Sequence, residues 1–176
     1  MANNGNKITV AVSAGVLACL SFFAHDPQIE GRTYVAIIPV PGDVPTICDG
    51  FTKGVKMGDT ATPAECDQHT IDELKVAESI FNAAVDPKVA ATLHPLTRAA
   101  YYSLIYNVGP GEKGRKDGFV RLKNGNPSTM LRLLNAGDVR ASCNQFVNWA
   151  KFQGRVLKGL MTRRKKEQAM CLAGLQ

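Results

Sequence analysis

The hydrophobic positions follow a helical period over much of the second half of the chain. Between residues 63 and 84, apolar side chains recur every three or four positions, at Ile71, Leu74, Ala77, Ile80 and Phe81. This is the spacing of one buried helix face. The preceding string Thr62-Pro63-Ala64-Glu65 matches a capping box with proline at the first helical position. We therefore expect a helix over about residues 63–84 that stops near Asp86-Pro87.

Four further helices are predicted downstream from apolar spacing and capping residues. They cover about residues 96–108, 128–134, 139–152 and 160–172. Residues 111–127, between the first two of these helices, are rich in glycine and charge. We expect this segment to form a long loop.

Residues 30–60 have a different pattern, in which β-branched residues are separated by glycine and proline. Pro41-Gly42 suits the centre of a type II turn, because proline presets φ at the first corner and glycine accepts a positive φ at the second. This pattern predicts a small β-hairpin. A hairpin followed by helices predicts an α+β fold, with a β-rich lobe over residues 25–61 and a mostly helical lobe over residues 62–176.

The N-terminal part of the chain contains an uninterrupted apolar run. Residues 8–24 form a 17-residue stretch without a charged side chain, which is the lower length limit for a membrane-spanning helix. Small and hydroxyl residues within it make this a weak span. A cleaved signal peptide, a lipoprotein signal at Cys19 and a buried core helix are alternatives. We favour an uncleaved transmembrane segment over residues 1–24, followed by one catalytic unit over residues 25–176.

Composition narrows the class of protein. A chain of 176 residues can bury a core of its own. Its apolar fraction of 45% and charged fraction of 20% are close to globular averages, which argues against a disordered or polytopic membrane protein. The net charge of +6 favours polyanionic partners such as nucleic acid, anionic lipid or bacterial cell wall. Nucleic acid is disfavoured, because no helix-turn-helix, zinc-finger or RNA-binding signature accompanies the charge.

The five cysteines lack the CxxC or Cys/His spacing of a metal site, so we predict no metal and an oxidising compartment. Cys48 in the hairpin and Cys66 in the next helix are joined by a short connection, while Cys143 and Cys171 lie on the last two helices. We favour disulfides within these two pairs. The alternative is that all four are small buried hydrophobic residues. Cys19 is left over, inside the apolar run.

Five strings, in this order, resemble the phage-type lysozymes, glycoside hydrolase family 24. They are Glu30-Gly31, PTICDGFT at residues 45–52, YNVG at 106–109, STMLRLLNAGD at 128–138 and GLMTRRKKE at 159–167. The resemblance extends from about residue 29 to the C-terminus. The apolar N-terminal run adds a resemblance to the signal-arrest-release endolysins of lambdoid phages.

The resemblance implies a lysozyme-like fold and an enzyme that hydrolyses the β-1,4 bond between N-acetylmuramic acid and N-acetylglucosamine in peptidoglycan. Such an enzyme needs no cofactor and is expected to be a monomer. The resemblance also implies a location at the host inner membrane facing the periplasm, then release into the periplasm, with a holin or pinholin as functional partner. A lytic transglycosylase and a membrane-anchored peptidoglycan-binding protein with a decayed active site are alternatives.

The resemblance also implies catalytic residues. Glycoside cleavage needs an acid near the leaving oxygen and a group that positions water or stabilises positive charge. Glu30 matches the family's acid, and Thr46 matches its water-positioning threonine. The family's third residue is an Asp or Cys nine positions after the acid and six before the threonine, but these counts lead here to Pro39 and Val40. Asp43 is the sole acid between Glu30 and Thr46, so it is our candidate for this role.

Further candidates come from the other strings. Tyr106 and Asn107, near a helix end, are expected to bind substrate, whereas Asp49 is expected only to cap the hairpin. Arg163 and Arg164 are expected either to pair with helix carboxylates or to contact substrate. The long loop is expected either to grip cell wall or lipid or to be solvated; its cations and apolar residues are Lys113, Arg115, Lys116, Arg121, Lys123, Phe119 and Leu122.

The short distance between the apolar run and Glu30 suggests how activity is controlled. Only residues 25–29 separate the two, so a membrane-embedded run would hold the proposed acid against the membrane surface. Collapse of the membrane potential would release the segment, which could then pack on the catalytic domain.

Overall fold

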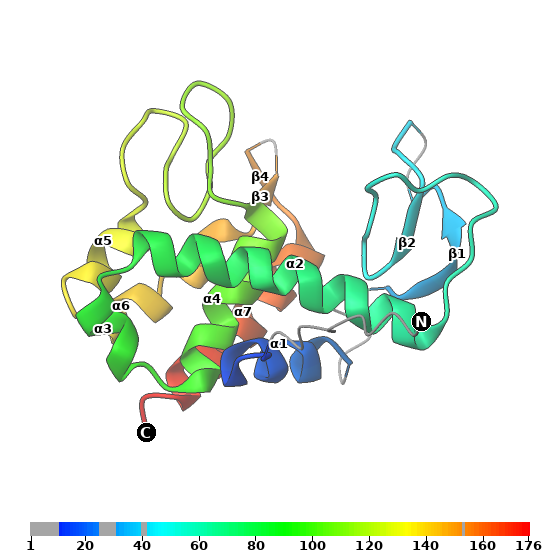
Figure 1. The fold of residues 1–176 in the computed structure, drawn as a ribbon. Helices are drawn as coiled ribbons and strands as arrows, with labels where there is room; N and C mark the ends of the chain where they lie inside the picture. The colour runs from blue at the N-terminus through cyan, green and yellow to red at the C-terminus, as the bar shows by residue number, and fades with distance from the viewer. Residues whose placement is uncertain (1–10, 25–30, 40–41, 153) are drawn as a thin grey trace, which may run out of the picture.

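The molecule has two lobes, a small β lobe and a larger helical lobe (Figure 1). The computed structural model describes residues 11–24, 31–39, 42–152 and 154–176. Helix α2 (Pro63–Ala84) begins beside the β lobe and extends across the helical lobe, so it connects the two (Figure 1). This is the α+β architecture that the sequence predicts.

The β lobe is built on a short antiparallel pair. Strand β1 (Thr33–Ile37) pairs with β2 (Thr46–Cys48), with Thr33 opposite Cys48 and Ile37 opposite Thr46. The lobe has only a small apolar cluster, centred on Ile47, Cys48 and Cys66. A disulfide between these two cysteines joins β2 to the first turns of α2.

Helix α2 has the predicted bounds and the predicted cap. The Thr62 side chain accepts a hydrogen bond from the backbone of Glu65, and the Glu65 side chain accepts one from the backbone of Thr62. Beyond α2, the short helix α3 (Pro87–Thr92) follows Asp86, which caps it. The sequence analysis missed α3. Helix α4 (Pro95–Val108) then enters the centre of the helical lobe.

Helix α4 is surrounded by α1, α2 and α7 (Lys158–Ala173). Its residues 99–105 are all buried, which explains why the apolar string there belongs to the core. A cluster of aromatic rings fills the space around it, with ring centroids 5.4 to 6.1 Å apart; its members are Phe81, Tyr101, Tyr102, Phe119 and Phe146. Phe119 comes from the long basic loop, so it anchors that loop to the core and is not part of an exposed gripping surface.

The N-terminal apolar run contributes helix α1 (Ala14–Ala24), which packs against α4 and α2. Val16, Cys19 and Phe23 are buried in the main core. Gly15 permits the close approach to α4, since a Cβ at this position would lie 2.8 Å from Cε2 of Tyr102. Within the described ranges, no helix is both long and apolar enough to span a bilayer. The first part of the predicted span, residues 8–10, lies outside the described residues.

The predicted helix over residues 139–152 is wrong. Helix α5 (Thr129–Asn135), capped by Ser128, is followed by α6 (Val139–Cys143) and a single 3₁₀ turn, η1 (Phe146–Trp149). The chain then forms a second antiparallel hairpin from β3 (Lys151–Phe152) and β4 (Arg155–Val156). Gly154 has a φ of 79°, which favours glycine and suits a tight reversal rather than a helix.

Both disulfide pairs that the sequence analysis favours are present. The second joins Cys143 at the end of α6 to Cys171 in the last turns of α7, 28 residues later. All four bonded cysteines are buried. Each lobe therefore has one disulfide that fastens it to a long helix.

Candidate active site

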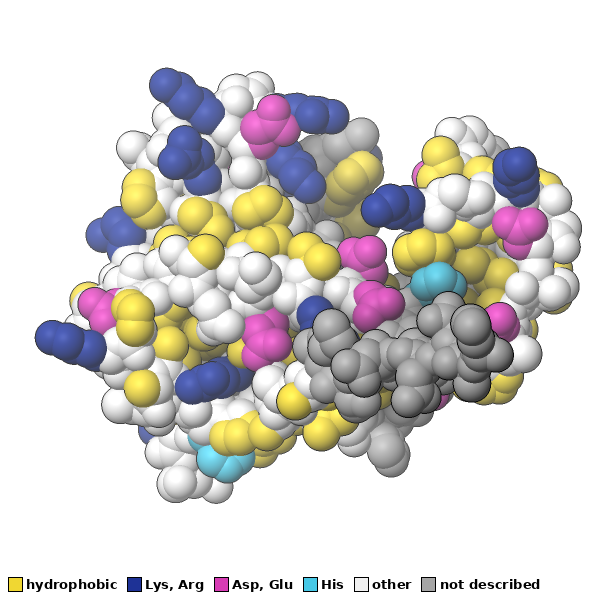
Figure 2. All heavy atoms as spheres, viewed as in Figure 1, with side chains coloured by type: hydrophobic (Ala, Val, Ile, Leu, Met, Phe, Trp, Pro, Cys, Tyr) yellow, Lys and Arg dark blue, Asp and Glu magenta, His cyan; other side chains and the backbone are white. Residues whose placement is uncertain are grey.

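A cavity of about 420 Å³ lies between the two lobes, where three separate elements meet. The segment that follows β2 contributes residues 49–53, α2 contributes Glu73, and the end of α4 contributes Tyr106 and Asn107. The space-filling view shows the surface hollowed between the helical lobe and the β lobe (Figure 2). We refer to this cavity as the cleft.

Among the described residues, two predicted site residues line the cleft, Tyr106 and Asn107. The Tyr106 hydroxyl donates a hydrogen bond of 2.7 Å to the backbone carbonyl of Asp49, so it joins the two lobes directly. Its ring also packs against Phe23 of α1, with centroids 5.4 Å apart. Asn107 accepts a 2.8 Å hydrogen bond from Arg164 through its side-chain oxygen. Both residues are thus held in fixed positions at the end of α4.

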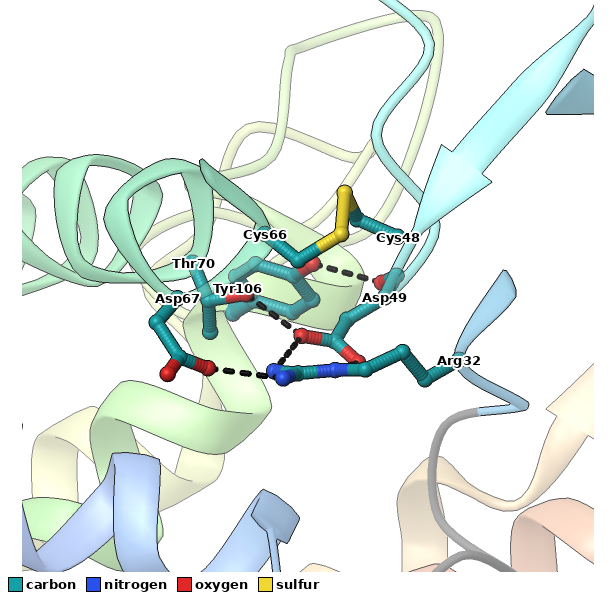
Figure 3. A network of polar contacts seen from close by, with 7 residues as sticks. All are labelled: Arg32, Cys48, Asp49, Cys66, Asp67, Thr70 and Tyr106. Carbon is teal, nitrogen blue, oxygen red and sulfur yellow. Dashed lines mark hydrogen bonds and ion pairs between the residues drawn. A yellow bond between two sulfur atoms is a disulfide. The ribbon is translucent and has the colours of Figure 1, made fainter. Parts of the chain in front are cut away.

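Asp49 is buried and belongs to an ion-pair network on the β-lobe side of the cleft (Figure 3). Its carboxylate accepts two hydrogen bonds from Arg32, of 2.8 and 2.6 Å, and a third of 2.6 Å from the Thr70 hydroxyl. Arg32 also donates to Asp67 at 2.7 Å. The hydrogen bonds that Arg32 donates to Asp49 are the main reason why the pKa of Arg32 is raised above its ordinary value, against the opposing effect of burial. The network fastens the start of β1 to β2 and α2.

This network corrects the expectation that Asp49 only caps the hairpin. Sequence reasoning missed the Arg32–Asp49 pair because its members are 17 positions apart and meet only through the tertiary fold. It also missed Glu73, whose exposed side chain lines the cleft from α2. The apolar period of α2 gives no sign that this surface position faces a cavity.

A second polar network lies inside the helical lobe. Glu167 is fully buried and forms ion pairs of 3.1 Å with both Arg163 and Arg164. It also accepts a 2.6 Å hydrogen bond from the Ser103 hydroxyl. Arg163 stacks over the Phe23 ring at 5.5 Å. Two roles are expected for these arginines, and the structure shows the pairing with a helix carboxylate. Arg164 also connects this network to Asn107 in the cleft.

The structure describes two of the three residues that are expected to carry the chemistry. Glu30 falls outside the described residues. Asp43 is exposed on the hairpin turn, where its carboxylate accepts the backbone N–H of Val44 at 2.9 Å. Thr46 is half-buried and its hydroxyl donates to the carbonyl of Val44 at 3.1 Å. Asp43 in the turn and Thr46 at the start of β2 thus both bond to Val44, but neither is among the described residues that line the cleft.

The cleft offers a ligand uncharged polar groups and an aromatic face, beside the charged side chains of Lys53 and Glu73. The amide of Asn107, the hydroxyl of Thr52 and the ring of Phe51 supply hydrogen bonds and an apolar face. The Phe51 ring is itself held by stacking on His69 at 4.2 Å. Across the part of the chain that the structure describes, no group of three His, Cys, Asp or Glu side chains is arranged to hold a metal ion.

The two-lobed fold with a cleft between a β-hairpin and a helical lobe is that of a lysozyme-like protein, and solved structures agree. The active form of the P1 phage endolysin Lyz superposes with a TM-score of 0.71 at 20% identity, covering 95% of this chain and 96% of that one. A mutant of P22 lysozyme superposes with a TM-score of 0.65 at 25% identity, covering 91% of this chain and 96% of that one. The secreted inactive form of the P1 endolysin superposes with a TM-score of 0.54 at 20% identity, covering 94% of this chain and 98% of that one.

Sequence comparison identifies the family. The phage lysozyme family matches residues 27–167. The SAR-endolysin of Enterobacteria phage P21 is 33% identical over 174 residues, which cover 96% of this chain and 95% of the phage P21 protein. The SAR-endolysin of Bacteriophage PS119 is 36% identical over 97% of this chain and 95% of its own length. The chain therefore belongs to the phage lysozyme family. It is a glycosidase of the endolysin type that lyses peptidoglycan.

Proposed function

We propose that this phage lysozyme hydrolyses the β-1,4 bond between N-acetylmuramic acid and N-acetylglucosamine, with Glu30 as the general acid. The observation that carries this proposal is the cleft between the lobes, in a chain that matches SAR-endolysins over almost its whole length. In this cleft, the amide of Asn107, the hydroxyl of Thr52 and the ring of Phe51 suit a neutral N-acetylated sugar.

The roles of the hairpin residues follow from the requirements of the reaction. We propose that Thr46 positions the attacking water. Asp43 is our candidate for stabilising positive charge, although its carboxylate bonds to its own turn. An Asp43→Ala variant that lyses cells at a near wild-type rate would exclude Asp43 from catalysis.

We also propose that the chain is first tethered to the inner membrane through residues 1–24 and is later released into the periplasm. The name SAR-endolysin of its relatives and the apolar run support tethering. The burial of Val16, Cys19 and Phe23 in the core supports a released state in which the segment packs on the domain. The higher TM-score to the active form of the P1 endolysin than to its inactive form agrees with this. A holin or pinholin would trigger release by collapsing the membrane potential.

The catalytic proposal is tested with the full-length protein, because removal of α1 would open the core. The rate of turbidity loss of a suspension of purified Gram-negative sacculi is measured for the wild type, Glu30→Gln and Asp72→Asn. Loss of a general acid lowers the rate by about 100-fold or more. Asp72→Asn removes an exposed carboxylate of α2 and should leave the rate unchanged. A Glu30→Gln variant as fast as Asp72→Asn would exclude the proposed acid.

The tethering proposal is tested by fractionating host cells that express the chain. In energised cells we expect the protein in the membrane fraction and no lysis. After an uncoupler is added, we expect it in the soluble fraction, followed by lysis. Lysis of energised cells by protein that is still in the membrane fraction would contradict the proposed control.

A further inference from the structure

Two charged side chains line the cleft without a partner of their own. Lys53 comes from the segment that follows β2, Glu73 comes from α2, and both are exposed. The carboxylate of Asp49, the third charged residue of the cleft, is already bound by Arg32 and Thr70 (Figure 3). Among the described residues, neither Lys53 nor Glu73 has an ion-pair partner, and the two do not pair with each other. The cleft therefore offers a ligand one free carboxylate and one free ammonium group.

The backbones that carry these two charges are held next to each other by the fold. Phe51, two residues before Lys53, exchanges two backbone hydrogen bonds of 2.9 Å with Ile47. The Phe51 ring stacks on His69 of α2, with centroids 4.2 Å apart. His69 lies one helical turn before Glu73, on the same side of α2. Groups that are held in place before binding lose less entropy when a ligand arrives, so this pair is suited to recognition.

A free carboxylate distinguishes the two sugars that alternate along the glycan of peptidoglycan. In N-acetylglucosamine the C3 hydroxyl is free and lies next to the amide N–H at C2, so the sugar presents two neighbouring donors. In N-acetylmuramic acid the C3 oxygen is an ether that carries the lactyl group, so only the N–H remains. A carboxylate accepts hydrogen bonds with both of its oxygens. It therefore binds N-acetylglucosamine better, and it repels the acidic peptide that the lactyl group carries.

We propose that Glu73 is a specificity-determining residue that binds the C3 hydroxyl and the amide N–H of one N-acetylglucosamine unit. Lys53 donates to the acetamido carbonyl oxygen of the same sugar. This assignment rests on the proposed muramidase function and adds to it the register of the glycan strand. Because the two sugars alternate, a position reserved for N-acetylglucosamine determines which kind of glycosidic bond reaches the proposed acid. A strand shifted by one sugar would place N-acetylmuramic acid at Glu73.

The test compares two inhibitors of the release of new saccharide ends from sacculi by the full-length protein. One is tri-N-acetylchitotriose, in which every sugar has a free C3 hydroxyl, and the other is the same trisaccharide methylated at each C3 oxygen. For the wild type we expect an inhibition constant about tenfold lower for the unmethylated form, as the loss of one hydrogen bond to a charged group would give. Glu73→Ala should bind both forms as weakly as the wild type binds the methylated form. The matched control Asp72→Ala removes the neighbouring exposed carboxylate of α2, which does not line the cleft, and should keep the wild-type preference.

The role of Lys53 gives a different result in the same assay, because both inhibitors carry acetamido groups. Lys53→Ala should raise both inhibition constants about threefold, as for one exposed charged contact, and leave their ratio unchanged. Lys56→Ala, which removes an exposed lysine outside the cleft, is its control. The exchanged variant Lys53→Glu/Glu73→Lys should lose the preference as Glu73→Ala does. Urea unfolding should be the same for all variants, since the substituted side chains are exposed.

Four results would overturn the assignment alone. The first is a wild type that binds the two trisaccharides equally, and the second is a Glu73→Ala variant that keeps the preference. The third is an Asp72→Ala variant that loses as much as Glu73→Ala. The fourth is an exchanged variant that regains the wild-type inhibition constants, because Lys53 and Glu73 would then act by pairing with each other. A wild type that releases no ends from sacculi would overturn the muramidase function itself, and this assignment with it.

Discussion

The two lobes that form the cleft are stabilised in different ways. Among its described residues, the β lobe has a buried apolar cluster of three residues, and it is held by one disulfide and the Arg32 ion pairs. The helical lobe has an extended aromatic core, to which α1 contributes, and a fully buried Glu167 with two arginines. A lobe with few residues needs covalent and polar links, whereas the larger lobe can use the N-terminal segment as part of its core. The stability of the helical lobe is therefore tied to where that segment lies.

The largest effect is expected from the buried charge in the helical lobe. Glu167→Gln leaves Arg163 and Arg164 without their shared carboxylate, which should lower the free energy of unfolding by about 3–5 kcal/mol. Urea unfolding of the purified protein measures this, with exposed Asp72→Asn as the control. A loss as small as that of the control would show that the buried network adds nothing to the stability of this lobe.

Phe23→Ala should come next, because it removes a ring that contacts both Tyr106 and Arg163. Truncation of a buried phenylalanine costs about 3 kcal/mol. Leu17→Ala on the same helix is the matched control, since Leu17 is 52% exposed and should lose less than about 0.5 kcal/mol. Equal, small losses in both variants would mean that α1 is not part of the core in solution.

The polar network of the β lobe should give a smaller loss. Asp49→Asn keeps the shape of the side chain but removes the charge that faces Arg32, which should cost about 1–3 kcal/mol. Asp67→Asn removes the more exposed partner and should cost less than about 1 kcal/mol. Differential scanning calorimetry ranks the two variants. A larger loss of stability in Asp67→Asn than in Asp49→Asn would contradict this ranking, because the network would then be anchored at the surface of α2 and not at the cleft.

The smallest effect near neutral pH concerns the tyrosines of the helical core. Burial raises the pKa of Tyr101 and Tyr102 above the ordinary value of 10.0. A pKa raised on folding gives stability that is fully present below pH 10 and is lost as pH rises above it, at up to about 1.4 kcal/mol per pH unit for each group. Unfolding free energies measured across this alkaline range should fall less steeply in Tyr101→Phe. A Tyr101→Phe variant that keeps the wild-type slope would contradict this prediction.

Local signals predicted much of the fold, and tertiary contacts account for the errors. The capping box at Thr62 and the apolar period of α2 are both local, so this helix was predicted with its correct bounds. The segment over residues 139–152 has apolar residues at helical spacing too, but α6 ends at Cys143, a 3₁₀ turn follows, and residues 151–152 pair with β4 instead of continuing a helix. The N-terminal run is ambiguous because an apolar helix has the same sequence pattern in a membrane and in a core.

The candidate site was predictable only where a string of residues marks it. Tyr106 and Asn107 end a helix in a recognisable string and line the cleft. Glu30, Thr46 and Asp43 come from the same resemblance and remain predictions. The Arg32–Asp49 pair joins residues that are 17 positions apart and meet only in the tertiary fold, so no local sequence pattern predicts it.

The most direct test of the central claim is the chemistry of the new saccharide ends that the full-length protein produces from sacculi. Hydrolysis by a cleft that positions water predicts reducing N-acetylmuramic acid ends, detected by reduction with borohydride and mass spectrometry. Fragments that end in 1,6-anhydro-N-acetylmuramic acid would contradict the account, because they form without an attacking water.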